Sequence, residues 1–197
     1  CTGAIERTVS FAVNDIPGVL LASAVRDYAI NFGVYIGQKT VVITNNDDAY
    51  KTAIFLKESG LEVPVILDAR EHGGGESAAR ARAMGIRVEN GKVISRVIGR
   101  KRVLGVHVCL SSGEGETIER IGCDAVAMSG GWSPVVHLWS HCGGKLEWND
   151  ESSMFCPDKS RPPTNENGES FVETVGAASG NTQLNEIVKE ATELGLY

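Results

Sequence analysis

Residues 37–70, GQKTVVITNNDDAYKTAIFLKESGLEVPVILDAR, carry the strongest structural signal in the chain. Residues 40–43 and 64–67 are short apolar runs, which are typical of strands buried on both faces of a parallel sheet. Between them, Ala49, Ala53 and Leu56 fall on one side of a helix that Gly60 ends. This pattern predicts a strand, a helix and a strand, the βαβ unit from which dinucleotide-binding sheets are built.

The turn after the first strand departs from the usual dinucleotide pattern. That pattern, G-x-G-x-x-G, leaves room for a pyrophosphate at the start of the helix. Here the three glycine positions hold Thr44, Asn46 and Ala49, and two acidic residues follow Asn46. We expect the Asn46 side chain to lie where the phosphates would be, and the Asp47 and Asp48 carboxylates to cap the helix.

Two interpretations of this turn stay open. In the first, the turn belongs to a dinucleotide fold whose own pocket is impaired or empty. In the second, it is an unusual but working nucleotide site. The residues of such a site would be Thr44, Asn45, Asn46 and Asp68, the last of which ends the second strand.

Composition and charge narrow the class of protein. The chain has 197 residues, 42% of them hydrophobic, so it can bury a sizeable core in one large or two small domains. Its formal net charge of −6 argues against nucleic acid and anionic membranes as partners. No apolar run reaches the roughly 20 residues that a bilayer requires, and no leader is visible. Five scattered cysteines without a C-x-x-C pair predict free thiols in a reducing compartment, the cytoplasm.

The segments outside residues 37–70 predict further elements. Residues 93–121 contain three alternating runs joined by short turns, which indicates an antiparallel meander. The other expected elements are a helix at 17–32, a helix at 76–84, a strand at 86–88, a buried strand at 123–131, a turn at 132–134, a strand at 170–177 and a helix at 184–194.

Motifs for metal binding or catalysis are weak. His137 and His141 are four residues apart and could share a metal ion on a helix, but spacing places no third ligand, so we expect packing and no metal. The run Gly73–Gly75 lacks the Lys-Ser/Thr of a phosphate loop, so we expect a flexible loop. No nucleophile, base and orienting residue can be assembled from spacing, and we nominate no catalytic residue.

The order of these elements resembles that of a known group of flavoproteins. A Thr-Gly-Ala opening, a helix, the βαβ unit, a meander and the strand CDAVAMSGGWSP are arranged as in the two-dinucleotide-domain flavoproteins typified by disulfide reductases. More closely, CTGAIER, VVITNNDDAY, SGGWSPVVHL and VGAASG resemble the α subunit of heterotetrameric sarcosine oxidases. The resemblance covers nearly the whole chain, but only the middle part of such a subunit.

The resemblance implies an α/β fold. We expect a Rossmann-like parallel sheet with a β-meander, of the FAD/NAD(P)-binding, glutathione-reductase-like type, plus flanking pieces of a second dinucleotide domain. Residues 37–150 would be the inserted nucleotide-binding-like domain. Residues 1–36 and 151–197 would be pieces of the outer domain that it interrupts, and the chain would be part of a longer polypeptide.

The resemblance also implies a function for a whole complex, the oxidative demethylation of sarcosine to glycine. It implies that NAD is bound by the outer domain of the full-length subunit, and that FAD and FMN are held elsewhere in the complex and are not expected in this segment. The implied partners are the other subunits of the oxidase. The residues implied to line the outer pocket are Thr2, Gly3, Gly176, Ala177, Thr182 and Leu184.

Two hypotheses of different classes follow. In the first, the chain is a cofactor-binding or scaffold segment of a sarcosine oxidase α subunit, or of a related opine or amine oxidase subunit, and is inactive alone. In the second, it is a self-contained NAD(P)-binding module that uses Asn45, Asn46 and Asp68. A disulfide reductase is disfavoured because the sequence lacks a paired redox-cysteine motif.

Overall fold

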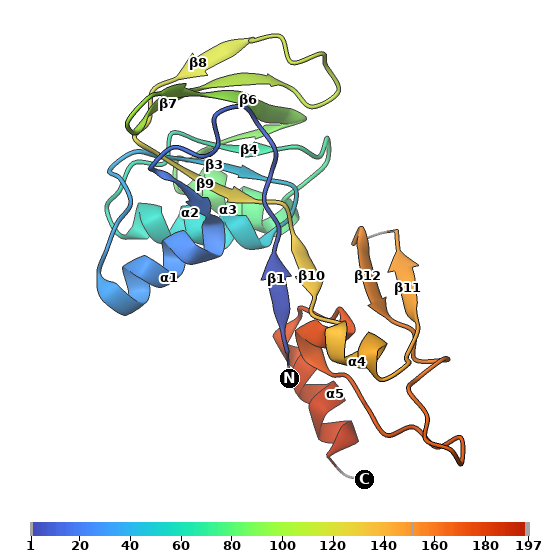
Figure 1. The fold of residues 1–197 in the computed structure, drawn as a ribbon. Coiled ribbons are helices and arrows are strands. Elements are labelled where there is room, and N and C mark those ends of the chain that lie inside the picture. The colour runs from blue at the N-terminus through green and yellow to red at the C-terminus, as the bar shows by residue number, and fades with distance from the viewer. Residues whose placement is uncertain (1, 151, 196–197) are drawn as a thin grey trace. The chain divides into compact units, whose positions relative to one another are not determined.

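The computed structural model describes residues 2–150 and 152–195, which form two compact units (Figure 1). Unit 1 consists of Cys1–Glu6 and Trp132–Tyr197, and unit 2 is Arg7–Gly131. These borders differ from the expected breaks after residues 36 and 150. The first break moves because residues 19–32 supply a strand and a helix to the same sheet as residues 40–129.

Unit 2 is built on a five-stranded parallel sheet with the order β2-β9-β3-β4-β5. The strands are β2 (Val19–Leu21), β3 (Thr40–Thr44), β4 (Val65–Asp68), β5 (Arg87–Asn90) and β9 (Ala125–Ser129). β3 is the central strand, and Val42 pairs with Ile66 on one side and Ala127 on the other. The predicted βαβ unit and the strands at 86–88 and 123–131 are therefore confirmed.

Three helices cover one face of this sheet (Figure 1). They are α1 (Ala22–Phe32), α2 (Asp48–Glu58) and α3 (Gly75–Ala83). The predicted face of α2 is buried, since Ala49, Ala53 and Leu56 are at most 1% exposed. They pack against Val42 and Ile66, whose side chains point to the helix side of the sheet.

The meander covers the opposite face, as Figure 1 shows. Its strands are β6 (Lys92–Gly99), β7 (Val103–Leu110) and β8 (Glu119–Ile121), all antiparallel to their neighbours. Val41 and Ile43 of β3 pack against Val97 and Val106 of the meander. Each such side chain contributes roughly 1.5–3 kcal/mol on full burial, so β3 is stabilised from both faces.

The predicted helix at 17–32 is wrong in its first part. Residues 19–21 form β2, because this apolar run pairs with β9 and fills the sheet edge, and α1 begins only at Ala22. Tyr28 and Phe32 follow the buried Val25 at helical spacing, yet both are exposed. The predicted end is confirmed: Gly33 has φ 63° and donates its N–H to the Ala29 carbonyl.

Within residues 2–6, 132–150 and 152–195, unit 1 contains two small antiparallel sheets and three helical segments. The sheets pair β1 (Ala4–Glu6) with β10 (Trp132–Pro134) and β11 (Leu146–Asn149) with β12 (Met154–Pro157). The helical segments are α4 (His137–His141), the 3₁₀ turn η1 (Gly176–Ser179) and α5 (Leu184–Leu194).

Several elements of unit 1 differ from those that the sequence predicts. The predicted turn at 132–134 is β10, because its backbone pairs with β1 from the other end of the chain. The predicted strand at 170–177 is wrong, and that segment runs into η1 without a strand of its own. The hairpin β11–β12 was not predicted. The helix at 184–194 is confirmed, although Leu184 and Val188 on its apolar face are exposed.

None of the helices in the described part of the chain is long and apolar enough to span a bilayer.

Candidate functional site

The candidate site lies at the carboxyl ends of β3 and β9 in unit 2. These two strands are neighbours, but the chain leaves β3 toward β4 and β5 on one side and returns as β9 on the other. In open parallel sheets such a reversal of strand order leaves a crevice, and ligands bind there. The turn from Asn45 to Asp48 emerges at this point, between β3 and α2.

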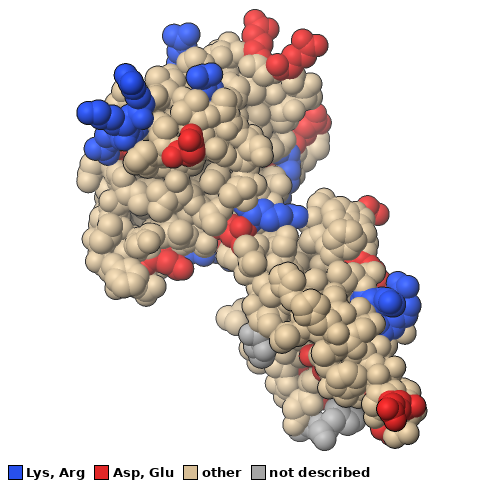
Figure 2. All heavy atoms as spheres, in the orientation of Figure 1, with Lys and Arg blue, Asp and Glu red and all other residues tan. Residues whose placement is uncertain are grey.

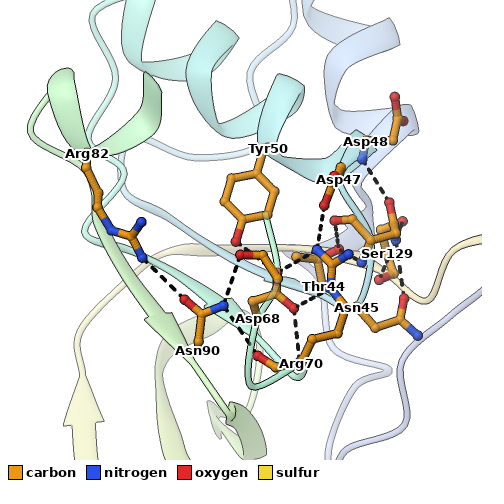
Figure 3. Close-up of polar contacts among 12 residues, drawn as sticks. Thr44, Asn45, Asp47, Asp48, Tyr50, Asp68, Arg70, Arg82, Asn90 and Ser129 are labelled. Atoms are coloured by element: carbon orange, nitrogen blue, oxygen red, sulfur yellow. Dashed lines mark hydrogen bonds and ion pairs between the residues drawn. The ribbon is translucent and has the colours of Figure 1, made fainter. Parts of the chain in front are cut away.

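Asn46 joins the ends of β3 and β9, which Thr44 and Ser129 mark in Figure 3. Its side-chain Nδ2 donates hydrogen bonds to Ser129 Oγ at 2.9 Å and to the Ser129 carbonyl at 3.2 Å. Its Oδ1 accepts the backbone N–H of Asp48 at 3.0 Å. Thr44 Oγ1 accepts the Asn46 N–H at 3.0 Å and fixes the turn. A side chain thus fills the position that glycine leaves bare in a dinucleotide turn, and it takes up an N–H at the start of α2.

The two aspartates do not cap the helix with their side chains, contrary to expectation. The Asn46 amide oxygen accepts the N–H instead. Asp47 Oδ1 pairs with Arg70 Nη2 at 2.6 Å, and Asp48 pairs with Arg26 at 3.4 Å and Lys51 at 3.1 Å. Both carboxylates are therefore neutralised by nearby cations. The residues of the turn and of the first turn of α2 do not reveal these ion pairs by themselves.

Asp68 ends β4 and is fully buried. Its Oδ1 accepts the backbone N–H and Nε–H of Arg70, both at 3.0 Å. Its Oδ2 accepts Arg70 Nη2 at 2.7 Å and the Tyr50 hydroxyl at 2.8 Å. A carboxylate offers about four lone-pair positions, so these four donors use its whole accepting capacity. In working dinucleotide sites an acidic residue at this place accepts from the ribose hydroxyls.

The surroundings of Asp68 hold its partners in their donor forms. Burial raises the pKa of Tyr50, and the hydrogen bond to the Asp68 carboxylate raises it further. The hydrogen bond to Asp68 likewise raises the pKa of Arg70. Tyr50 therefore stays a neutral phenol and Arg70 a cation at physiological pH, and both continue to donate to Asp68.

The glycine run at 73–75 lies directly over this cluster. A Cβ on Gly73 would overlap the Asp68 carboxylate, and one on Gly74 would overlap the Tyr50 ring and hydroxyl. Asn90 Nδ2 donates to the Arg70 carbonyl at 3.4 Å (Figure 3) and to the Gly73 carbonyl at 3.1 Å, so β5 also fixes the loop. The expected flexible loop is instead a close-packed cover, and glycine is required there because the backbone touches Tyr50 and Asp68.

The residues predicted to line the outer pocket all lie in unit 1. Thr2 Oγ1 donates to the Val135 carbonyl at 2.7 Å, and Gly3 has φ 73° with open space around it. Gly176 and Ala177 begin η1, which packs beside β10. Thr182 and Leu184 are exposed at the start of α5.

The Gly176 turn also has an internal partner that sequence reasoning missed. Glu190 Oε2 accepts the Gly176 N–H at 2.8 Å, and both Glu190 oxygens accept from Ser179 Oγ, at 3.0 and 3.1 Å. Burial alone would raise the pKa of Glu190, but the hydrogen bonds from Lys159, Gly176 and Ser179 outweigh it and hold that pKa below its ordinary value. The Gly176 N–H is thus already bound within the chain.

Sequence reasoning also missed Tyr50, Arg70 and Ser129. Of the three, Arg70 has the strongest signal in the sequence, because an arginine two residues after a strand-ending aspartate can bend back and bind that aspartate. Ser129 and Tyr50 carry no comparable local signal, since their roles depend on the pairing of β9 with β3 and on the packing of α2.

Metal-ligating and redox groups are not gathered in the described residues. No group of three or more His, Cys, Asp or Glu side chains there could hold a metal ion. Cys109, Cys123, Cys142 and Cys156 are free thiols. Burial raises the pKa of the Cys123 thiol to about 12, so this cysteine is a poor nucleophile.

The parallel sheet of unit 2, with its reversal of strand order at β3 and β9, is a Rossmann-type fold. Thioredoxin reductase from T. acidophilum superposes with a TM-score of 0.73 at 19% identity, covering 98% of this chain and 62% of that one. L-Proline dehydrogenase from P. horikoshii superposes with a TM-score of 0.55 at 20% identity, covering 90% of this chain and 28% of that one. At such low identities the likeness shows the fold alone.

The relatives recognised by sequence are sarcosine oxidase α subunits. The chain is 36% identical over 154 residues to that of Rhizobium meliloti (strain 1021) and 40% identical over 161 residues to that of Corynebacterium sp. (strain P-1). These matches cover 78% and 80% of the chain, but only 15% and 16% of the relatives' length. No protein-family profile matches. The chain is therefore homologous to one segment of a sarcosine oxidase α subunit.

Proposed function

We propose that the chain is a scaffold segment of a sarcosine oxidase α-type subunit, and that the crevice of unit 2 does not hold a dinucleotide. The observation that carries this proposal is the side-chain network of the crevice. Asn46 spans the phosphate position, and Asp68 has no accepting capacity left for a ribose. The residues present at the crevice do not fit a dinucleotide.

In this proposal the parallel sheet survives as a rigid core. The helices on one face and the meander on the other keep their full packing, while the polar groups that a cofactor would satisfy are satisfied by the chain itself. The buried network then stabilises the fold in place of a ligand. The role of unit 2 is to hold other parts of a cytoplasmic oxidase complex in position.

The oxidation of sarcosine to glycine belongs, in this proposal, to the complete assembly and not to the segment alone. The names of the relatives, sarcosine oxidase subunit alpha, and the Rossmann-type fold support this interpretation. Flavins are held by other parts of the complex. NAD is bound by the outer dinucleotide domain, to which unit 1 contributes Thr2, Gly3 and the turn Gly176–Ala177, with Thr182 and Leu184 beyond it. Flanking parts of the same domain complete that pocket.

The alternative, a self-contained NAD(P) module, has one observation in its favour. The strand order reverses at β3 and β9, which is where such modules bind nucleotides, and Thr44, Asn45 and Asp68 lie around that point. Binding there would require Arg70 and Asn46 to leave their present partners.

Calorimetric titration of the purified chain with NAD and with NADP separates the two functions. The scaffold proposal predicts no measurable heat of binding to unit 2 for either nucleotide. Micromolar binding that disappears in an Asp68→Asn variant would overturn the proposal and support the module. Binding that is unchanged in this variant but lost in Gly3→Val would locate the nucleotide in unit 1 and leave the scaffold reading of unit 2 intact.

A further inference from the structure

The outer face of the meander carries an unusual row of basic side chains. Arg96 of β6, His107 of β7 and Arg120 of β8 are direct cross-strand partners. Both arginines are exposed, and His107 is half-buried. The turn between β6 and β7 adds three more exposed cations. We call Arg96, Arg100, Lys101, Arg102 and Arg120 the basic face.

The basic face differs from every other arginine environment in the described residues. Outside the meander, each arginine is held by a hydrogen bond or an ion pair. Their partners are Gly130 for Arg7, Asp48 for Arg26, Asp68 for Arg70, Glu58 for Arg80, Asn90 for Arg82, Glu119 for Arg87 and Asp158 for Arg161. Within the described residues, no hydrogen bond or ion pair engages the side chains of the basic face.

This concentration of unpaired cations is unfavourable for the isolated fold. Like charges on one face of a sheet repel each other. The chain has more acidic than basic residues, with a net charge of −6, so acidic partners for these cations would be available within the sequence. Arg96 and Arg120 lie one strand to either side of His107, so their backbones are roughly 10 Å apart, twice the strand spacing. The sheet tolerates the two arginines because a histidine separates them, but nothing in the described chain compensates them.

The charges are also segregated along the meander. Figure 2 shows Lys and Arg gathered over the end of the meander where β6 turns into β7, and acidic side chains over the opposite end. The acidic end is the loop at 111–118, which carries the exposed Glu114 and Glu116. A surface that is basic at one end and acidic at the other has a defined polarity, which can orient a charged partner.

We infer that the basic face is a docking surface for an acidic surface of another subunit of the oxidase complex. The inference rests on the proposed function, which supplies the partner. Arginine suits this role because its planar fork binds carboxylates with two hydrogen bonds, and unpaired guanidinium groups are available without first breaking a pair. The overall negative charge of the chain disfavours nucleic acid as the partner, since long-range repulsion would oppose approach.

The test uses the full subunit that contains this chain, with the other purified oxidase subunits as the probe. Association is measured by biolayer interferometry at low and at physiological ionic strength. The variant Arg96→Glu/Arg120→Glu should weaken association at least about tenfold and flatten its salt dependence, because two of the five attractive charges are reversed and the net attraction falls. The control Lys57→Glu/Lys189→Glu makes the same change in net charge on α2 and α5, and should stay within about twofold of the wild type.

Two results of the association measurement would overturn the docking surface. Equal weakening in both variants would mean that net charge alone matters, and equal affinity in wild type and Arg96→Glu/Arg120→Glu would mean that the partner docks elsewhere. Either result overturns the docking surface. Failure of the wild-type subunit to associate with the oxidase subunits at all would overturn the proposed function together with this inference. Binding of a labelled DNA duplex that the arginine variant abolishes would reassign the face to nucleic acid.

Discussion

Two turns, the one after β3 and the one at Gly176, were predicted to lie at dinucleotide pockets, and the chain's own side chains engage them in different ways. At the turn after β3, Asn46 joins two strands and Asp68 is fully buried among its donors. At the Gly176 turn, the Glu190 carboxylate of α5 accepts the Gly176 N–H, and the Glu190 side chain is 18% exposed. The first turn is closed by the core of the fold, whereas the second is closed by one residue at its edge.

The two turns therefore differ in how deeply their side-chain partners are built into the fold. Removing the groups at the β3 turn should damage unit 2, because they are part of its core. Removing Glu190 should free the Gly176 N–H at little cost. All three tryptophans, Trp132, Trp139 and Trp148, lie in unit 1, so their fluorescence reports on that unit alone.

The largest expected effect comes from Asp68→Asn. The change leaves Arg70 without its buried counter-charge and weakens the acceptor of the Tyr50 hydroxyl. Breaking a buried pair on one side typically costs about 3–5 kcal/mol, and we expect a loss of unfolding free energy at the lower end of that range. Hydrogen exchange of the β3 and β4 amides measures it, because unit 2 has no tryptophan.

Asp47→Asn is the matched control for this prediction. It makes the same chemical change on the other carboxylate that binds Arg70, but Asp47 is 58% exposed. Exposed pairs contribute about 0–1 kcal/mol, so exchange protection should change little. Similar losses in the two variants would show that the cluster is not a structural core, and the contrast between the two turns would fail.

The next effect concerns nucleotide affinity at the β3 turn. In Asn46→Gly/Asp47→Ala the backbone is bare at the phosphate position and one carboxylate is removed. We expect NAD to bind at least about tenfold tighter than to the wild type, equivalent to about 1.4 kcal/mol. Titration followed by NMR suits this measurement because it detects millimolar affinities.

Asp48→Ala tests whether charge alone explains any such gain. Asp48 is one residue further into α2 and already pairs with Arg26 and Lys51, so its removal should change affinity less than about twofold. A gain equal to that of the double variant would contradict the steric role assigned to Asn46.

The smallest effect is the pH dependence carried by Glu190. Its hydrogen bonds lower its pKa in the folded state below the ordinary value of 4.5. The stabilisation is therefore complete above pH 4.5 and is lost as the pH falls through the lowered folded-state value. Glu190→Gln should cost unit 1 about 1 kcal/mol at neutral pH and should remove this acid-dependent component.

Tryptophan fluorescence during urea unfolding measures the Glu190 effect in unit 1. The control Glu186→Gln lies one turn earlier on the same helix, is exposed and has no partner in the described residues, so its unfolding curve should match the wild type. A pH profile that is identical in wild type and Glu190→Gln would show that the carboxylate does not hold the Gly176 turn.

Most of unit 2 could be predicted from the sequence because its periodicity is unambiguous. Residues 40–43 and 65–67 are buried, and the apolar and polar residues of the meander alternate clearly enough for its strands to be placed before any pairing is known. Elements that depend on distant partners failed. Residues 19–21 and 132–134 become strands only because β9 and β1 lie beside them, and neither run has a local signal stronger than that for a helix or a turn.

The site could be predicted in part. The bulk of Asn46 at the phosphate position follows from its place in the turn. Its anchor at Ser129 is 83 residues away, and no spacing rule connects the two. The prediction that Asp47 and Asp48 cap α2 was wrong for a similar reason. Helix-end preferences depend on local sequence, whereas Arg70 contacts Asp47 from beyond the end of β4.

The most direct test of the central claim is a crystal structure of the chain grown with saturating NAD. The account predicts that the end of β3 stays as it is, with Asn46 Nδ2 on Ser129 and with Arg70 on Asp68, and that no diphosphate lies over Asn46. A diphosphate at the start of α2, with Asn46 displaced and Asp68 accepting from a ribose hydroxyl, would contradict it.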